Sequence, residues 1–257
     1  MLPESYAVVG SPQDPPLVLL NSLGATRGMW KPQVLELTRR FRIIMVEHRG
    51  HGGTSAGTGP FSIQDLAKDI IELLDYLDVR TTSLCGLSLG GIVSISIAAN
   101  YPERIDKLVL ACTSAYLGPA EPWMERANLV RRHGTMTLHE GLLQRWFTPG
   151  FVTGHPTISQ DVADMLDSVN PESYAWYCEA IGQMDQRSIV GQINAPTLII
   201  AGAQDPVTPP AMALDLNLAI ANSSMVVLDD ASHLANIESP HRFTQLVVDH
   251  LEELTCE

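Results

Sequence analysis

The 257-residue chain has the composition of an ordinary globular protein, with 45% hydrophobic and 18% charged residues. Its formal net charge of −13 argues against a nucleic-acid partner, because phosphate binding requires clustered Lys and Arg side chains. No segment reaches the roughly 18 apolar residues of a membrane-spanning helix, and the first residues show no basic stretch followed by an apolar one. We therefore expect a cytoplasmic protein with no membrane or nucleic-acid partner.

Short apolar runs that end in turn residues recur along the chain and are typical of buried strands. They cover residues 17–20, 43–46, 82–85, 108–112, 197–201 and 225–228. Helix-periodic stretches lie between them, at residues 63–77, 92–100 and 240–254, and Ser62 with Asp65 nearly matches the capping box that begins a helix. Strands that alternate with helices predict an α/β fold with a mostly parallel, doubly wound sheet.

The alternation stops between residues 117 and 193, where no strand pattern occurs. This segment is too long for a loop, and its helix-like patterns include Trp123, Trp146 and Trp176. We interpret it as a helical cap inserted between two strands, over the carboxyl ends where open α/β sheets bind ligands. The predicted organisation is a core of residues 1–116 and 194–257 with a cap of residues 117–193.

A G-x-S-x-G motif occupies residues 86–90, directly after one predicted strand and before a helix. This motif forms the nucleophile elbow, a sharp turn that holds its central residue, here Ser88, at positive φ above the sheet. The motif also occurs by chance in Gly- and Ser-rich loops, so the interpretation depends on its position between strand and helix. We predict that Ser88 is a nucleophile and that the Leu89 N–H stabilises an oxyanion.

A serine hydroxyl is a poor nucleophile unless a base accepts its proton, and in this arrangement an acid and a histidine follow the serine in that order. Asp205 follows the predicted strand 197–201, and His233 follows the strand 225–228. None of the other seven histidines follows these strands in the same way. We predict that His233 is the general base and that Asp205 orients it, with Asp229 or Asp230 as alternative orienting acids.

The loop after the first predicted strand, Asn-Ser-Leu-Gly at residues 21–24, is expected to supply the second oxyanion donor, the Leu23 N–H. A second glycine-rich loop, at residues 49–53, matches neither a P-loop nor a dinucleotide fingerprint, so we assign it to backbone architecture. The cysteines and histidines lack metal-ligand spacing. We therefore expect no metal ion and no organic cofactor.

With these residues, the chain resembles the α/β-hydrolase superfamily over its whole length and, within it, the 3-oxoadipate enol-lactonases of bacterial aromatic catabolism. The closer resemblance rests on six blocks: N-S-L-G at 21–24 with M-W at 29–30, R-G-H-G at 49–52, C-G-L-S-L-G-G at 85–91, W-M-E-R at 123–126, R-W-F-T-P at 145–149 and D-P-V-T-P-P at 205–210. One position departs from the family pattern, since Glu47 stands where its members have Asp, and we expect this difference to be structural.

The resemblance implies that Ser88 opens 3-oxoadipate enol-lactone, a carboxylate-bearing small molecule of the β-ketoadipate pathway, through an acyl-enzyme. His233 then activates the water that releases 3-oxoadipate. The cap should supply a donor for the substrate carboxylate, and its candidates are the indole N–H groups of Trp123 and Trp146 and the guanidinium of Arg126.

Other functions share the same frame. A carboxylesterase, a C–C bond hydrolase or a cofactor-free haloperoxidase or perhydrolase would use the same three side chains, and the cap would decide among them. A hydrolase-like receptor that binds a ligand with little turnover is a further alternative, which the complete set of three side chains disfavours. The serine in the elbow disfavours enzymes that use an aspartate nucleophile.

Overall fold

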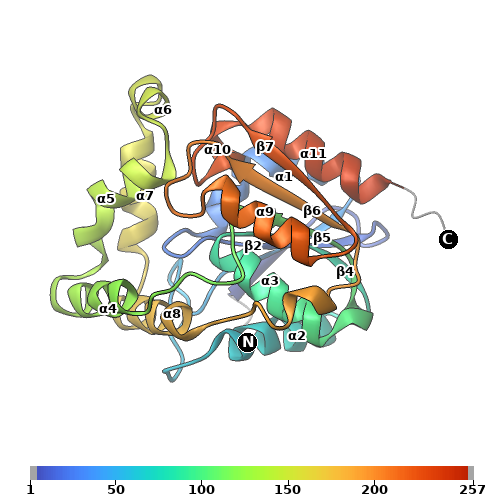
Figure 1. The fold of residues 1–257 in the computed structure, drawn as a ribbon, viewed down its shortest axis with the longest axis horizontal. Coiled ribbons are helices and arrows are strands. Elements are labelled where there is room, and N and C mark those ends of the chain that lie inside the picture. Colours follow the sequence, from blue (N-terminus) through green and yellow to red (C-terminus); the bar gives the residue numbers. More distant parts are fainter. Residues whose placement is uncertain (1–4, 254–257) are drawn as a thin grey trace.

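The computed structural model describes residues 5–253, which form a seven-stranded sheet flanked by helices (Figure 1). The strands are β1 (Tyr6–Val9), β2 (Pro16–Leu20), β3 (Arg42–Val46), β4 (Thr82–Leu87), β5 (Ile105–Ala111), β6 (Thr197–Gly202) and β7 (Ser223–Leu228). Their order is β1-β3-β2-β4-β5-β6-β7; β1 is antiparallel to β3, and all other neighbouring pairs are parallel. The predicted mostly parallel sheet and its six apolar strands are confirmed, whereas β1 was not predicted.

The helices connect the strands and close the chain. They are α1 (Lys31–Leu37), α2 (Ile63–Tyr76), α3 (Leu89–Asn100), α4 (Glu121–His133), α5 (His139–Trp146), α6 (Pro149–Gly154), α7 (Ile158–Asp167), α8 (Pro171–Gln183), α9 (Pro210–Ala219), α10 (Ala235–Glu238) and α11 (Pro240–Glu252). Helix α2 begins with the capping box that the sequence suggests, because Ser62 and Asp65 bond each other's backbone N–H. The predicted end of the last helix, Leu254, lies outside the described residues.

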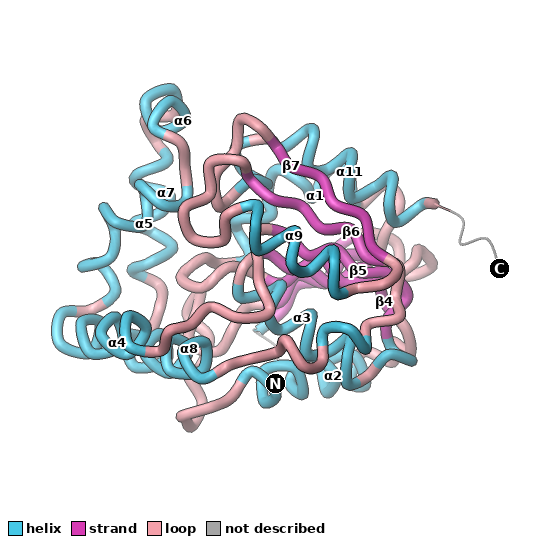
Figure 2. The backbone as a smooth tube through the Cα atoms, viewed as in Figure 1, coloured by secondary structure: helices cyan, strands magenta, loops and turns pink. Residues whose placement is uncertain are grey.

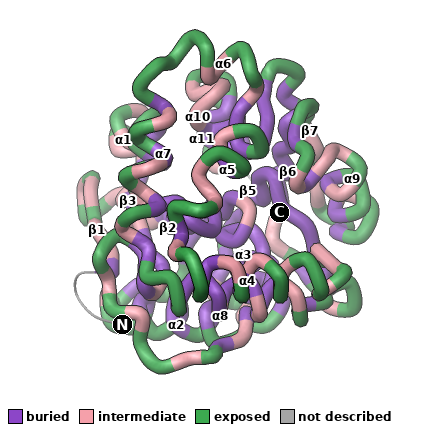
Figure 3. Tube along the Cα trace, turned by 90° about the vertical axis from the view of Figure 1, so that its left-hand side faces the viewer, coloured by how far each residue is buried: buried purple, intermediate pink, exposed green. Residues whose placement is uncertain are grey.

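The sheet is buried on both faces, and each face has its own apolar cluster. Successive side chains of a strand point to opposite faces. Thus Val18 and Leu20 of β2 belong to the cluster that contains the buried residues of α2, α3 and α9, whereas Leu17 and Leu19 belong to the cluster that contains those of α1 and α11. This explains why the parallel strands read as continuous apolar runs. Figure 3 shows α6 largely exposed; the central strands are buried, and the edge strands β1 and β7 are only partly buried.

Helices α4 to α8 lie between β5 and β6 in the chain, and no strand interrupts them in this described stretch. The chain enters and leaves this segment at an isolated bridge between Tyr116 and Asp185. Figures 1 and 2 show the five helices beyond the carboxyl ends of the strands, with loops between them and the sheet. The division into a core and a separate cap of residues 117–193 stays our proposal.

Within residues 5–253, no helix is long and apolar enough to cross a membrane.

The buried carboxyl group of Glu47, which follows β3, connects two loops at the carboxyl edge of the sheet. Its oxygens accept hydrogen bonds from the Asn21 side chain and from the Arg27 N–H, each at 3.1 Å. A Cβ at Gly52, whose φ is +56°, would lie 2.6 Å from the Glu47 Oε2 atom, so this position requires glycine. Burial raises the pKa of Glu47 to about 7, although its bonds with Arg27 and Asn21 oppose the shift.

The raised pKa of Glu47 predicts a pH-dependent stability contribution. The unfolded chain ionises this group at about pH 4.5, before the folded protein does, so its contribution is complete below that pH and declines as the pH rises to about 7. Relative to Glu47→Gln, the free energy of unfolding of the wild type should fall by about 3 kcal/mol across this window and then level off. Urea unfolding of both proteins at several pH values measures the difference. A difference that is constant with pH, or that grows as pH rises, would contradict the expectation.

Candidate active site

Ser88 is the residue between β4 and α3 and has a strained backbone, with φ 58° and ψ −115°. The neighbouring strand β5 fixes this turn from one side, because the Ser88 N–H donates to the Ala111 carbonyl and the Ser88 carbonyl accepts from the Thr113 hydroxyl. Such strain persists only where the surroundings over-determine it, and it concentrates at functional sites. The turn raises the Ser88 side chain above the carboxyl edge of the sheet.

Two glycines of the motif are required by close backbone contacts. A Cβ at Gly86 would lie 2.3 Å from the Gly90 carbonyl oxygen, and a Cβ at Gly90 would lie 2.1 Å from the Leu20 carbonyl oxygen. The N–H of Gly90 donates to the Asn21 carbonyl at 2.9 Å. The turn is therefore packed directly against the end of β2, which also carries the loop at residues 21–24.

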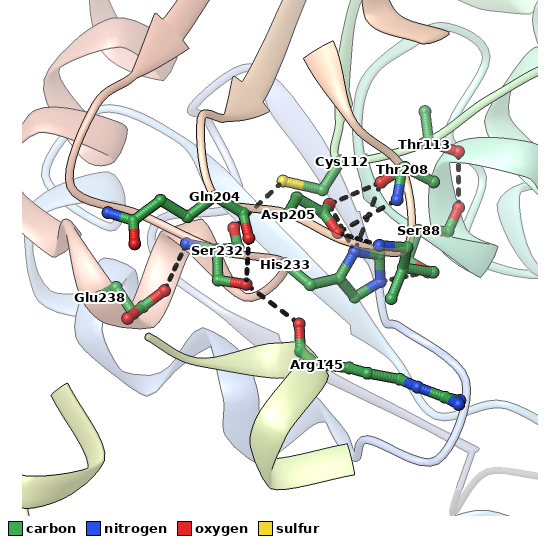
Figure 4. Close-up of polar contacts among 11 residues, drawn as sticks. Ser88, Cys112, Thr113, Arg145, Gln204, Asp205, Thr208, Ser232, His233 and Glu238 are labelled. Carbon is green, nitrogen blue, oxygen red and sulfur yellow. Dashed lines mark hydrogen bonds and ion pairs between the residues drawn. The ribbon is translucent and has the colours of Figure 1, made fainter. Parts of the chain in front are cut away.

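The structure brings together the three side chains predicted to form the catalytic set (Figure 4). The Ser88 Oγ atom lies 2.9 Å from the His233 Nε2 atom, and the His233 Nδ1 atom lies 2.7 Å from an oxygen of Asp205. His233 and Asp205 are buried, and they come from the loops after β7 and β6. This geometry allows His233 to accept the serine proton while Asp205 fixes the imidazole orientation. Asp229 and Asp230 are exposed in the preceding turn.

Hydrogen-bond donors around Asp205 stabilise the charged, carboxylate form of its side chain. One of its oxygens accepts the N–H groups of Val207 and Thr208, and the other accepts the Thr208 hydroxyl at 2.6 Å and faces His233. Burial alone would raise the pKa of Asp205, but the charge and hydrogen bonds of His233, with those of Thr208, hold it below its ordinary value. A charged Asp205 would stabilise the imidazolium that forms when His233 accepts a proton.

The two predicted oxyanion donors both lie at the candidate site. Leu89 begins α3, so its N–H has no acceptor within the helix, and it follows the Ser88 turn directly. The Leu23 N–H has no acceptor among the described residues, and Leu23 lines the same pocket as Ser88 and His233. The arrangement leaves two backbone donors next to the serine, as stabilisation of a tetrahedral oxyanion requires.

Two buried histidines hold the loop at residues 21–24 in place. Burial lowers the pKa of His51 to about 3, so the ring is neutral and its Nε2 atom accepts the Gly24 N–H at 3.1 Å. Burial likewise lowers the pKa of His48 to about 4, and its Nε2 atom lies 2.9 Å from the Asn21 carbonyl. The glycine-rich loop at residues 49–53 thus has the architectural role that the sequence indicates.

The pocket above Ser88 is mostly apolar and is lined by cap residues of α4, α5 and α8. Among the predicted carboxylate donors, Trp123, Arg126 and Trp146 all line it. The Trp123 indole N–H, however, donates to the Leu117 carbonyl at 2.7 Å. The only polar hydrogen of Trp123 thus has an acceptor in this structure, and the role of Trp123 as a substrate donor stays a prediction. Its ring instead lies 4.9 Å from the Arg126 guanidinium carbon.

Two further polar residues of this pocket were not selected from the sequence. Arg145 lies near the end of α5, and its side chain extends past His233 in Figure 4. Tyr174 of α8 is fully buried, and its hydroxyl interacts with the side chain of Arg126. Arg145 belongs to one of the blocks that carry the family resemblance, which was the available signal, whereas nothing in the sequence distinguishes Tyr174 from a core residue.

The end of α5 is joined to the loop that carries His233. The Ser232 hydroxyl donates to the Arg145 carbonyl at 3.0 Å, and the Leu234 N–H donates to the Trp146 carbonyl at 2.9 Å. Glu238 accepts hydrogen bonds from both Thr148 and the Ser232 N–H, so its carboxylate bridges the two segments. Helix α5 is thereby held at a fixed position relative to the imidazole of His233.

Comparisons with known proteins identify the family of the chain. The model of the alpha/beta hydrolase family matches residues 17–246. A 3-oxoadipate enol-lactonase of Acinetobacter baylyi is 38% identical over 95% of this chain and 91% of its own. The crystal structure of an enol-lactonase from Burkholderia xenovorans is also 38% identical and superposes with a TM-score of 0.94, covering 96% of both chains.

A more distant solved structure broadens the comparison. A thermophilic esterase from Thermogutta terrifontis is 28% identical, with a TM-score of 0.90, over 96% of this chain and 92% of its own. An enol-lactonase and an esterase thus both share the fold of this chain along almost its entire length. The chain is a hydrolase and belongs to the alpha/beta hydrolase family.

Proposed function

We propose that this protein is a serine hydrolase that converts 3-oxoadipate enol-lactone to 3-oxoadipate, with Ser88 as nucleophile, His233 as general base and Asp205 as orienting acid. The observation that carries the proposal is the hydrogen-bonded series from Ser88 through His233 to Asp205, at a pocket next to two free backbone donors. The substrate assignment draws its support from the enol-lactonases that are 38% identical to the chain.

In the first half-reaction, the Ser88 oxygen attacks the lactone carbonyl carbon as its proton passes to the His233 Nε2 atom. The carbonyl oxygen becomes an oxyanion that the Leu23 and Leu89 N–H groups stabilise. Collapse of this intermediate breaks the ring C–O bond and leaves an acyl-enzyme with an enolate within its acyl chain. The enolate takes the proton from His233 and becomes a ketone, so the leaving group requires little acid assistance.

In the second half-reaction, a water molecule takes the place of the leaving group as the hydrogen-bond partner of His233. The imidazole accepts one proton from water while the water oxygen attacks the acyl carbon, and the second tetrahedral intermediate forms in the same oxyanion site. Its collapse breaks the bond to Ser88, whose oxygen recovers a proton from His233, and 3-oxoadipate is released. The steps use no metal ion and no organic cofactor. The proposal includes a role in the β-ketoadipate pathway of bacterial aromatic catabolism, in the cytoplasm.

A carboxylesterase is the second candidate function. The esterase of Thermogutta terrifontis, 28% identical with a TM-score of 0.90, supports it. An ester and a lactone would pass through the same intermediates at Ser88, so the two candidates differ in the substrate that fits the pocket.

Ser88→Ala should abolish lactone opening, with kcat/KM reduced roughly 10³-fold or more, because the Ser88 hydroxyl is the one in the described pocket that lies within hydrogen-bond distance of His233. Ring opening of 3-oxoadipate enol-lactone is followed by absorbance, with p-nitrophenyl butyrate as a second substrate. Ser96→Ala, also in α3, is the control, since the Ser96 hydroxyl has no hydrogen-bond partner among residues 5–253. Ester turnover without lactone turnover by the wild type would favour the esterase. Full activity of Ser88→Ala would exclude the proposed nucleophile.

Asp205→Asn should lower kcat roughly 10³-fold to 10⁴-fold, because an amide in this position favours the wrong tautomer of His233. Asp229→Asn and Asp230→Asn are matched controls that should remain within about twofold of wild type, because both side chains are exposed. The steady-state kinetics of the three variants distinguish these assignments. A large loss in either control with an active Asp205→Asn would transfer the orienting role to the turn before His233.

A further inference from the structure

We propose that the Thr208 hydroxyl is a positioning group of the catalytic set and determines the lowest pH at which His233 acts as a base. It acts through the carboxylate of Asp205 and makes no contact with the substrate. The inference deepens the proposed function. It rests on the proposed assignment of Ser88, His233 and Asp205, and it does not depend on the identity of the substrate.

Three polar atoms from two loops meet on the side of the His233 imidazole that faces away from Ser88 (Figure 4). The Thr208 hydroxyl donates to the Asp205 Oδ2 atom at 2.6 Å, and the His233 Nδ1 atom lies 2.7 Å from the same oxygen. The Thr208 oxygen lies 3.4 Å from Nδ1. One carboxylate oxygen thus interacts with both groups, and the hydroxyl stabilises part of the negative charge that the imidazole faces.

The turn at residues 205–208 gives the hydroxyl this position. The other oxygen of Asp205 accepts the N–H groups of Val207 and Thr208, at 2.7 and 3.0 Å, which opposes rotation of the carboxylate. Thr208 is 1% exposed and is not among the described residues that line the pocket above Ser88, whereas Val207 is. The Thr208 hydroxyl therefore affects the reaction through Asp205 and His233 and not through the substrate.

The shared oxygen determines the direction of the effect. Burial would raise the pKa of Asp205, but the charge and hydrogen bond of His233, with the hydrogen bonds of Thr208, hold it below its ordinary value. A carboxylate that receives more hydrogen bonds is a weaker base and attracts a proton on the neighbouring imidazole less strongly. Thr208 therefore allows the imidazole to stay neutral, and to accept the serine proton, down to a lower pH.

Other titratable groups lie around His233 and Asp205 on the neighbouring elements. They come from the end of β5 and from α4, α5, α8 and α10, and they are Cys112, Arg126, Arg145, Tyr174 and Glu238. Burial raises the pKa of the Cys112 thiol and of the Tyr174 phenol, so both are neutral. Within residues 5–253, none of the five bonds to the Thr208 hydroxyl. Removal of that hydroxyl therefore leaves their charges unchanged.

Thr208→Val removes the hydroxyl at nearly constant side-chain volume, and Thr208→Ser keeps it. The measured quantity is the pH dependence of kcat/KM, whose acid limb reports protonation of the base in the free enzyme. Thr208→Val should move the midpoint of this limb up by about half a pH unit, which lowers kcat/KM about threefold below the midpoint. The loss should appear in kcat rather than in KM. Thr208→Ser should retain the wild-type midpoint.

Thr82→Val is the matched control. The Thr82 hydroxyl is buried as well and donates to the Pro16 carbonyl at 3.0 Å, but Thr82 begins β4 and so lies at the opposite edge of the sheet from Ser88. Its midpoint should equal that of the wild type. Each variant is assayed over the pH range in which its far-UV circular dichroism is constant. Within that range, the midpoint does not depend on the fraction of folded protein.

A double-mutant cycle tests whether Thr208 acts through Asp205. In the Asp205→Asn background, no carboxylate remains for the hydroxyl to stabilise, so addition of Thr208→Val should leave the midpoint where it is. A shift of the same size in both backgrounds would show that the hydroxyl acts independently of Asp205 and would overturn the inference.

An unchanged or lower midpoint in Thr208→Val would also overturn the inference, as would a Thr208→Ser variant that behaves like the valine variant. A failure of the proposed function gives a different result. If Ser88→Ala keeps full activity, the catalytic set and this inference both fail. If Ser88→Ala and Asp205→Asn lose activity and Thr208→Val keeps the wild-type midpoint, the catalytic set stands and the inference alone is wrong. If the wild type hydrolyses p-nitrophenyl butyrate but not the enol-lactone, the ester serves for every profile.

Discussion

The strained turn at Ser88 is the constraint on which the site depends. A left-handed φ at a non-glycine residue is unfavourable, and here it is stabilised by backbone bonds from two neighbouring strand ends. The Ala111 carbonyl holds the turn from β5, and the Asn21 carbonyl holds the Gly90 N–H from β2. These contacts place the serine, the first turn of α3 and the loop at residues 21–24 in one rigid group. The proposed oxyanion donors and the proposed nucleophile therefore have fixed relative positions without a ligand.

A second rigid group of residues carries His233, the proposed general base, together with Asp205. Burial of both side chains strengthens the electrostatic interaction between them. Asp205 receives two backbone N–H groups and the Thr208 hydroxyl, so a charge that would otherwise be expensive to bury is fully compensated. The carboxylate then stabilises positive charge on His233 in a medium where solvent screens little. At Asp205 the protein itself therefore supplies the hydrogen bonds that offset the cost of burying a charge.

The sequence predicted the sheet, its parallel connections and the residues at its carboxyl edge, because strand-ending motifs have fixed consequences in this fold. It did not predict β1, because its apolar run is only four residues long and forms an antiparallel edge strand that is only partly buried. It also could not show that the Trp123 indole N–H donates to the Leu117 carbonyl, or that Arg126 of α4 and Arg145 of α5 line the same pocket. Helix packing decides those contacts, and no local pattern encodes it.

The hydrogen bonds between α5 and the loop of His233 bear on how such a site can change during evolution. A helix that lines the substrate pocket and a loop that positions the base share the Ser232, Leu234 and Glu238 contacts, so they form one mechanical unit. Substitutions that reshape α4, α6 or α8 can alter the chemical range of the pocket while leaving proton transfer intact. If α5 were exchanged for that of a relative, poor packing of the helix would displace the imidazole of His233 through these hydrogen bonds. Substitutions that change substrate specificity should therefore occur in the helices around α5 rather than in the last turn of α5.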